Sequence, residues 1–231
     1  MLFRSYLAVE RERVHVVPHG LDLAGHGRRA ARAPGAPARI GFLARICHDK
    51  GLHHLVEACE LLVDAGAPPF KLHAAGYLGA GDRPYLRDLE RRAAAGPLAG
   101  RFTYHGELDR AAKIAFLQSL DVLSTPTVYR ESKGLPVLEA WANAVPVVVP
   151  DHGTFPELVA STGGGLLYPP GDVAQLAARL REVLEHPELR DALGDAGQRA
   201  VHERYHAEAM ARQTLDLYRR LSRRPAAARM A

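Results

Sequence analysis

Short apolar runs alternate along the chain with segments whose apolar residues recur at helical spacing. The clearest helical pattern runs from Gly51 to Val63, where apolar residues fall three and four positions apart. Strands are predicted at 14–17, 39–44, 71–75, 101–104, 122–125, 146–149 and 163–168. Helices are predicted at 51–63, 84–95, 110–120, 136–144 and from 172 onward, with a break near Pro187. Alternating strands and helices with short connections indicate a parallel sheet covered by helices on both faces.

The alternation predicts an α/β fold: a Rossmann-like, doubly wound parallel sheet followed by C-terminal helices. In such sheets ligands bind beyond the carboxyl ends of the strands, where loops lead into helices. Three polar segments follow predicted strands, at 45–51, 76–81 and 126–135. We therefore expect these segments to converge on one ligand site. Residues 24–38, which are mostly glycine, arginine, alanine and proline, are predicted to form a mobile surface segment.

Composition and charge narrow the class of protein. The chain has 231 residues, of which 47% are hydrophobic, and these are ordinary values for a globular protein. No apolar run is long enough to span a bilayer, and the N-terminus lacks the apolar core of a signal peptide. Cys47 and Cys59 do not form a disulfide framework. A cytoplasmic protein is therefore expected.

The formal net charge of +4 rests largely on arginine. The basic segment 219–224 is interpreted as a solvated helix end whose cations suit the helix dipole. Peripheral contact with anionic lipid at the inner face of the membrane is the alternative. Nucleic-acid binding is not expected, because no aromatic residues are interleaved with the arginines.

The segment 129–139 is typical of a loop that leads into an anion-binding helix start. Pro136 suits the first helical turn, where a missing N–H leaves no hydrogen bond unmade. Gly134 lets the preceding backbone approach a ligand closely. The amides of residues 132–135 are then expected to face a phosphate or a sugar hydroxyl.

Two cations and two carboxylates complete the predicted site. Arg45 offers a planar fork and Lys50 a compact charge just before the first strong helix, and both suit a diphosphate. Glu139 is placed in the first turn of its helix, where it also favours the dipole, and Glu131 on the loop outside. A ligand with phosphate and polyol groups, such as a nucleotide sugar, fits this set. No metal site is expected, because the histidines lack the spacing of metal ligands.

These segments together resemble the donor-binding domain of a GT-B glycosyltransferase of family 4, a retaining group. The family's Glu-x7-Glu pattern matches Glu131 and Glu139, and its Arg-x4-Lys-Gly element matches Arg45 and Lys50-Gly51, although alanine replaces a usual glycine at position 44. A Pro-Val-Val strand and a Gly-x-x-x-Glu element follow, beginning at positions 146 and 153. The resemblance extends over residues 14–222.

By this resemblance, the protein takes part in glycosyl transfer from a nucleotide-diphosphate sugar to an acceptor, with retention of configuration. The implied catalytic residues are Arg45, Lys50 and Glu131. The implied donor-binding residues are Ser132, Lys133, Gly134, Leu135, Glu139, Gly76, Tyr77 and Gly106. Glu139 would hold the ribose hydroxyls, and backbone near the last three residues would hold the base. The resemblance implies no metal and no other cofactor, and it leaves base, sugar and acceptor open.

The resemblance also divides the chain. Residues 1–37 would be a linker-like segment with a first strand, 38–200 the donor-binding domain, and 201–231 a helix that crosses to an acceptor domain, plus a basic tail. In the family that acceptor domain precedes a segment that here lies near the N-terminus. We therefore expect it to be fused or a separate chain, and this chain alone to transfer sugar poorly. An exposed apolar strip on the last helix is predicted to face it: Tyr205, Met210, Leu215 and Tyr218.

Two further functions remain open at this point. The chain can be a non-catalytic nucleotide-sugar-binding subunit of a two-chain enzyme, or a GT-B nucleotide-sugar epimerase. The Glu-x7-Glu pattern beside Arg-x4-Lys favours transfer over epimerisation. An upstream in-frame coding region would separate a fused enzyme from a two-chain one.

Overall fold

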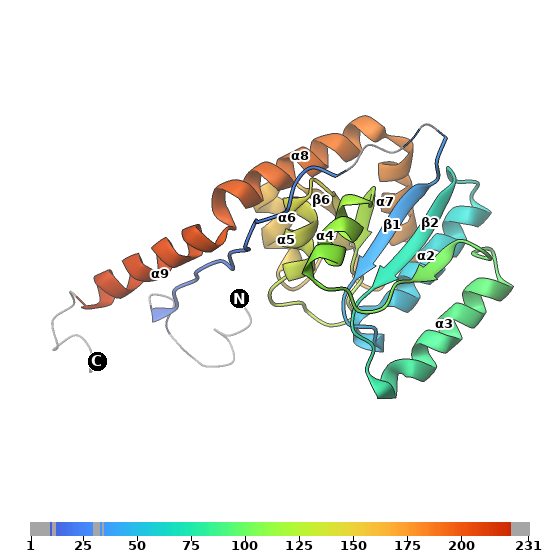
Figure 1. Ribbon diagram of the computed structural model, residues 1–231, viewed down its shortest axis with the longest axis horizontal. Helices are drawn as coiled ribbons and strands as arrows, with labels where there is room; N and C mark the ends of the chain where they lie inside the picture. The colour runs from blue at the N-terminus through green and yellow to red at the C-terminus, as the bar shows by residue number, and fades with distance from the viewer. Residues whose placement is uncertain (1–9, 11–12, 30–32, 34, 223–231) are drawn as a thin grey trace. The chain divides into compact units, whose positions relative to one another are not determined.

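Six parallel strands form a sheet in the order β3-β2-β1-β4-β5-β6 in the computed structural model, with helices packed around it (Figure 1). The structure describes all residues except 1–9, 11–12, 30–32, 34 and 223–231. The sheet lies in a compact unit of residues 23–202, and the two ends of the chain form a second unit.

The elements follow in chain order. The strands are β1 (Ala38–Leu43), β2 (Phe70–Ala75), β3 (Phe102–Tyr104), β4 (Val122–Ser124), β5 (Val147–Pro150) and β6 (Gly165–Tyr168). The helices are α2 (Leu52–Asp64), α3 (Arg83–Ala95), α4 (Arg110–Gln118), α5 (Leu135–Ala142), α6 (Phe155–Thr162), α7 (Val173–Glu185), α8 (Pro187–Arg204) and α9 (Ala207–Ser222). Short 3-10 turns at His48–Lys50 (η2) and Ala80–Asp82 (η3) precede α2 and α3.

Helices bury both faces of the sheet. On one face, Ile40 and Phe42 of β1 are fully buried in a core that α2, α3 and α7 share. On the other, the indole of Trp141 on α5 is fully buried and donates to the Gly164 carbonyl at 2.7 Å. A Cβ on Gly197 would lie 2.3 Å from that indole, so glycine lets α8 pack closely against it. The predicted α/β, doubly wound fold is confirmed.

Two expectations from the sequence are wrong, and one helix was not predicted. Residues 14–17 form no strand. The described part of the predicted mobile segment is held in place, since the amides of Gly27 and Arg29 donate to the side chain and carbonyl of Asn143 at 3.2 and 2.8 Å. Helix α6 was not predicted, although Pro156 stands in its first turn, where proline is tolerated.

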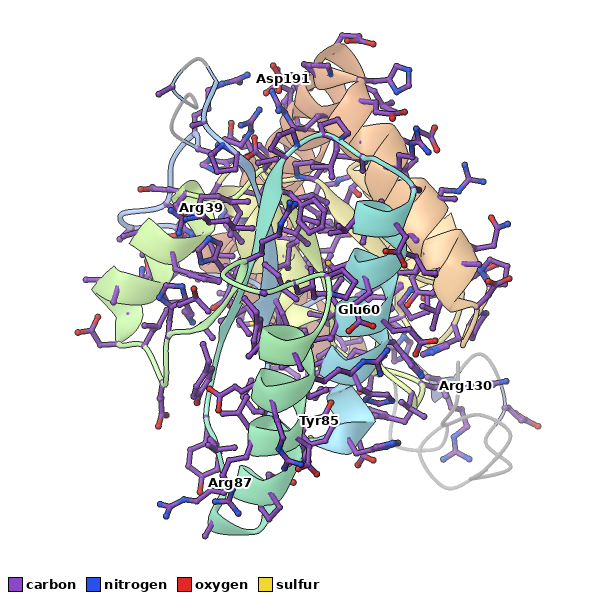
Figure 2. The ribbon with its side chains drawn as sticks, turned by 90° about the vertical axis from the view of Figure 1, so that its right-hand side faces the viewer. Arg39, Glu60, Tyr85, Arg87, Arg130 and Asp191 are labelled. Atoms are coloured by element: carbon purple, nitrogen blue, oxygen red, sulfur yellow. The ribbon has the colours of Figure 1, made fainter. Side chains whose placement is uncertain are left out.

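Helices α2 and α3 are tied together on one flank of the sheet. Figure 2 shows Glu60 on α2 and Tyr85 on the neighbouring α3. Arg92 pairs with Glu60 at 2.5 Å, and the amide of His53 donates to the Tyr85 hydroxyl at 3.0 Å. The contact of His53 lies in the first turn of α2, which follows the predicted phosphate-binding loop, and the pair of Arg92 and Glu60 joins later turns of the two helices.

The chain ends form their own unit. Leu21 pairs with the turn between α8 and α9 through hydrogen bonds to Tyr205 and Ala207 of 2.8 and 2.9 Å. On α9, Leu215 and Tyr218 are 47% and 65% exposed. Tyr205 is buried, so the predicted apolar strip is wrong at that position.

Two other predictions concern the C-terminal segment: the apolar strip at Met210 and the basic segment 219–224. Met210 is half-buried, and its Sδ accepts a hydrogen bond from the Gly20 amide. Arg219 and Arg220 stand in the last turn of α9, whereas Arg223 and Arg224 lie outside the described residues. No helix in the described part of the chain is long and apolar enough to cross a membrane.

A buried histidine in the sheet predicts acid sensitivity. His73 of β2 is 7% exposed, and burial lowers its pKa from 6.5 to about 4. The folded protein therefore keeps the ring neutral, while the unfolded chain takes up a proton below pH 6.5. Its contribution to stability is present above pH 6.5 and is lost as the pH falls toward 4. Because of this ring, the free energy of unfolding is expected to fall by about 2 kcal/mol between pH 7 and pH 5.

Urea unfolding at pH 7 and 5 measures this loss. We expect His73→Leu to remove about 2 kcal/mol of the pH dependence, and the same change at the exposed His186 to remove none. An unchanged pH dependence in His73→Leu would contradict this account of the buried ring.

Candidate functional site

Loops after β1, β2 and β4 meet at the carboxyl edge of the sheet. A Cβ on Gly51 would lie 1.8 Å from the carbonyl oxygen of Pro126, and a Cβ on Gly76 would lie 1.9 Å from that of Ala44. Both glycines have positive φ, so these close approaches exclude other residues. The predicted convergence of the three polar segments is confirmed.

Lys50, Tyr129 and Glu131 form a hydrogen-bonded cluster where these loops meet. The Lys50 ammonium donates to the Glu131 carboxylate at 2.7 Å and also to the Tyr129 hydroxyl. That hydroxyl donates to the same carboxylate oxygen at 2.9 Å, and the ammonium lies 4.8 Å from the centre of the tyrosine ring. The lysine and the carboxylate stand 81 positions apart in the sequence. The structure therefore joins the two halves of the predicted site.

Glu131 also orders its own loop. Its second oxygen accepts the amides of Ser132 and Lys133 at 3.0 and 3.2 Å. Burial alone would raise the pKa of this carboxyl, but the hydrogen bonds from Lys50, the Lys133 amide and Tyr129 outweigh it and bring the pKa to about 2. The carboxylate is thus charged throughout the neutral range. The expectation that these two amides face a ligand is wrong in this structure, because Glu131 already occupies them.

Arg45 stands on the same loop as Lys50 but makes a different contact. Its guanidinium is exposed, and Nε donates to Sγ of the buried Cys47 at 3.3 Å. In the described part of the chain, Lys50 and not Arg45 contacts Glu131. Both predicted cations lie at the carboxyl end of β1, and only one of them is paired with the carboxylate.

Glu139 is positioned differently from the prediction. Helix α5 begins at Leu135 and has no acidic residue in its first turn, so the predicted dipole role of Glu139 is wrong. Its carboxylate instead pairs with Lys113 of α4 at 2.5 Å, and its side chain is 16% exposed. The site thus has a second pairing of an ammonium with a carboxylate, on the helix that follows the Glu131 loop.

Gly134 stands at the start of α5, in a backbone conformation that favours glycine. Gly134 caps the helix with a φ of 66°. A Cβ there would lie 2.7 Å from the Leu158 side chain, so glycine lets the start of α5 pack closely against α6. Leu135, the next residue, is 36% exposed at the helix start.

The residues predicted to face a base lie next to one another. The amide of Gly76 donates to the Gly106 carbonyl at 2.9 Å, and the Tyr104 hydroxyl donates to the Gly76 carbonyl at 2.7 Å. Tyr77 is 54% exposed beside them. The loops after β2 and β3 are thereby joined.

Three histidine rings lie close together at the start of α2. The rings of His48 and His53 stack at 4.3 Å, and that of His54 lies 4.2 Å from His53. Burial lowers the pKa of His53 to about 4. Within the described residues, no group of three or more His, Cys, Asp or Glu side chains is arranged to hold a metal ion.

Sequence reasoning missed three residues that contact this site. Tyr129 stands two positions before Glu131, and alternate residues of an extended loop share a side, which is a usable signal. His152 follows β5 at the same edge of the sheet, and its Nε2 lies 3.0 Å from the Thr127 carbonyl. Lys113 pairs with its carboxylate across two helices, which no local pattern indicates.

Comparison with known proteins finds a family model and several relatives that match most of this chain. The family model for "Glycosyl transferases group 1" matches residues 27–200. A 2-deoxystreptamine glucosyltransferase from Streptomyces kanamyceticus is 37% identical over 153 residues, which are 66% of this chain and 38% of that protein. An alpha-maltose-1-phosphate synthase from Mycolicibacterium smegmatis is 32% identical over 241 positions, covering 96% of this chain and 60% of the relative. The chain spans 38% and 60% of these two relatives.

Solved structures show the same fold. Sucrose-phosphate synthase from Thermosynechococcus elongatus superposes with a TM-score of 0.81 and 25% identity, over 95% of this chain and 55% of that chain. The C-terminal domain of a glycosyl transferase group 1 family protein from Francisella tularensis has a TM-score of 0.71 and 23% identity, over 81% of this chain and all of that domain (100%).

Proposed function

The chain belongs to the glycosyl transferases group 1 family, with the GT-B-type Rossmann-like fold, and we propose that it binds the nucleotide-diphosphate sugar from which a sugar is transferred. We further propose that it is of the family 4 type, so that the product keeps the anomeric configuration of the donor. The paired Lys50, Tyr129 and Glu131 at the carboxyl edge of the sheet carry this proposal.

The chemistry of the cluster suits a diphosphate leaving group. As the bond between the sugar and the β-phosphate oxygen breaks, negative charge grows on that phosphate. Lys50 and Arg45, which stand on one loop, are assigned to stabilise that charge. The leaving phosphate then accepts the proton of the acceptor hydroxyl, which bonds to the sugar on the face that the phosphate leaves. In this proposal the two side chains supply the positive charge, and no metal is required.

Glu131 and Glu139 are assigned separate tasks. Glu131 is charged and half-buried beside Lys50, so we assign it to the transferred sugar, with Gly134 and Leu135 nearby. Glu139, paired with Lys113, is assigned to the ribose hydroxyls, which a carboxylate oxygen can accept. Backbone at Gly76 and Gly106 is assigned to the base.

The remaining parts of the enzyme are also proposals. The relatives are longer than this chain, so we propose an acceptor-binding domain, fused or separate, that completes the active site. Its expected contact is the exposed face of α9 at Leu215 and Tyr218. The free thiols of Cys47 and Cys59 support a cytoplasmic location.

Calorimetric titration with uridine, guanosine and adenosine diphosphates tests the proposal. We expect at least one of them to bind in the presence of EDTA, because side chains supply the cations. Glu139→Ala is expected to weaken that binding by about 10- to 100-fold, since it removes a charged acceptor of ribose hydroxyls. The 2′-deoxy diphosphate should lose less affinity in Glu139→Ala than the ribonucleoside diphosphate does, because one of the two hydroxyls is already absent.

The matched control is the exposed Glu203, whose change to alanine should leave the affinity unaltered. Absence of binding to all three diphosphates would overturn the proposed function. Equal affinity of wild type and Glu139→Ala would remove Glu139 from the site while leaving the function in place.

A further inference from the structure

The loop that carries Tyr129 and Glu131 is hydrogen-bonded to two neighbouring segments. On the side of α2, the amide of Val128 donates to the Asp49 carbonyl at 2.9 Å. On the other side lies the turn 152–154, between β5 and α6. The Thr154 amide of this turn donates to the Glu131 carbonyl at 2.8 Å. This backbone hydrogen bond holds the far end of the loop against the turn.

The turn can approach Glu131 because of Gly153. This glycine has a φ of 64°, and a Cβ there would lie 2.4 Å from the Glu131 carbonyl oxygen and 2.6 Å from its nitrogen. A side chain at position 153 would therefore push the carboxylate-bearing residue away. The close approach also brings the neighbouring side chain, His152, beneath the near end of the same loop.

His152 is the side-chain contact between this turn and the near end of the loop. Its Nε2 lies 3.0 Å from the Thr127 carbonyl oxygen. A carbonyl only accepts, so Nε2 donates this hydrogen bond. Nδ1 is buried and has no hydrogen-bond partner among the residues that the structure describes, so the bond to Thr127 is the ring's polar contact within that part of the chain. The ring lies 6.5 Å from that of Phe155, which restricts its orientation.

We propose that His152 is a positioning residue for the donor site, a role that rests on the function proposed above. Its bond to Thr127 and the bond from Thr154 to Glu131 hold both ends of the loop between them. Tyr129 lies between these two anchors, and its hydroxyl meets the Lys50 ammonium. His152 therefore acts on the diphosphate through Lys50. It holds the loop in the position where Tyr129 contacts the Lys50 ammonium, and it does not itself contact the ligand.

Affinity for the nucleoside diphosphate that wild type binds best tests this role. His152→Phe keeps a ring of similar shape and removes the donor, so we expect about 3- to 10-fold weaker binding. His152→Gln carries an N–H at a similar reach and should restore most of the affinity. In a Lys50→Met background, His152→Phe should change the affinity by less than about twofold, because its effect passes through Lys50. A merely structural role would weaken binding equally in both backgrounds.

A ligand-free measurement keeps the two proposals apart. Amide hydrogen exchange of Val128, followed by NMR, reports directly on the loop. We expect His152→Phe to accelerate it and His152→Gln not to. The control His186→Phe removes a ring-to-carbonyl contact at the end of α7 and should change neither affinity nor exchange. Wild type that binds no diphosphate would refute the proposed function, while unchanged Val128 exchange in His152→Phe would refute the role of His152.

Discussion

Replacement of Asp121 by alanine is expected to lower the free energy of unfolding by about 3–5 kcal/mol, because it removes the buried carboxylate of a charge cluster. It leaves Arg29 and Arg190 paired with the carboxylate of Asp191. Asp121 is 2% exposed just before β4, and its carboxylate accepts the Arg39 amide at 2.9 Å and the Arg190 guanidinium at 3.1 Å. Arg29 lies 3.5 Å from the same carboxylate. The single carboxylate thus joins the edge of β1, helix α8 and the segment that precedes β1.

Two further variants separate charge from packing at this position. Asp121→Asn keeps an acceptor for the Arg39 amide but removes the charge, so its loss should fall between wild type and Asp121→Ala. The exposed pair of Asp216 and Arg219, 3.5 Å apart, is the control, and Asp216→Ala should cost less than about 1 kcal/mol. Urea unfolding at pH 7 measures all three. A loss below about 1 kcal/mol for Asp121→Ala would show that water or a shifted side chain replaces the carboxylate.

The regular part of the fold could be predicted because the sheet is buried on both faces. Strand β5 is fully buried, and such strands stand out as unbroken apolar runs. Helix α2 was expected at 51–63 and occupies Leu52–Asp64, because one apolar stripe and Gly51 mark its face and its start. These signals are local, so one sequence suffices to find them.

The errors arise where structure depends on a distant partner. Residues 14–17 have the apolar pattern of a strand, but a strand also needs a neighbour to pair with, and in the structure they have no such pairing. Tyr205 fits the spacing of the exposed α9 stripe, yet it lies in the turn before α9, where its carbonyl accepts the Leu21 amide. Neither partner is visible in the local pattern.

The candidate site divides in the same way. That Lys50 and Glu131 share one edge of the sheet follows from topology, because parallel strands end at the same side. That they neutralise each other does not follow, since a side-chain pair depends on the path of both loops. The unpredicted pairing changes the chemistry: the cation proposed for a diphosphate is already engaged by a carboxylate.

This pairing predicts opposite effects for its two members. Lys50→Met is expected to weaken nucleoside diphosphate binding by about 10- to 100-fold, because a charge-assisted contact is lost. Glu131→Gln is expected to strengthen binding of the same diphosphate by about 3- to 10-fold, because a negative charge beside the phosphates is removed. Affinity for the complete nucleotide sugar should nevertheless fall relative to the diphosphate in Glu131→Gln, since Glu131 is assigned to the sugar.

The double variant shows how much of the Lys50 effect belongs to the lysine. Lys50→Met alone leaves the half-buried Glu131 carboxylate without its cation, so part of the lost affinity is repulsion by that carboxylate. Adding Glu131→Gln should therefore recover several-fold of the affinity, and the recovery is the repulsive share. Lys71→Met, at an exposed position of β2, controls for general loss of positive charge. If Glu131→Gln weakens diphosphate binding as strongly as Lys50→Met does, the two side chains act together on the phosphates, and the separate task given to Glu131 is wrong.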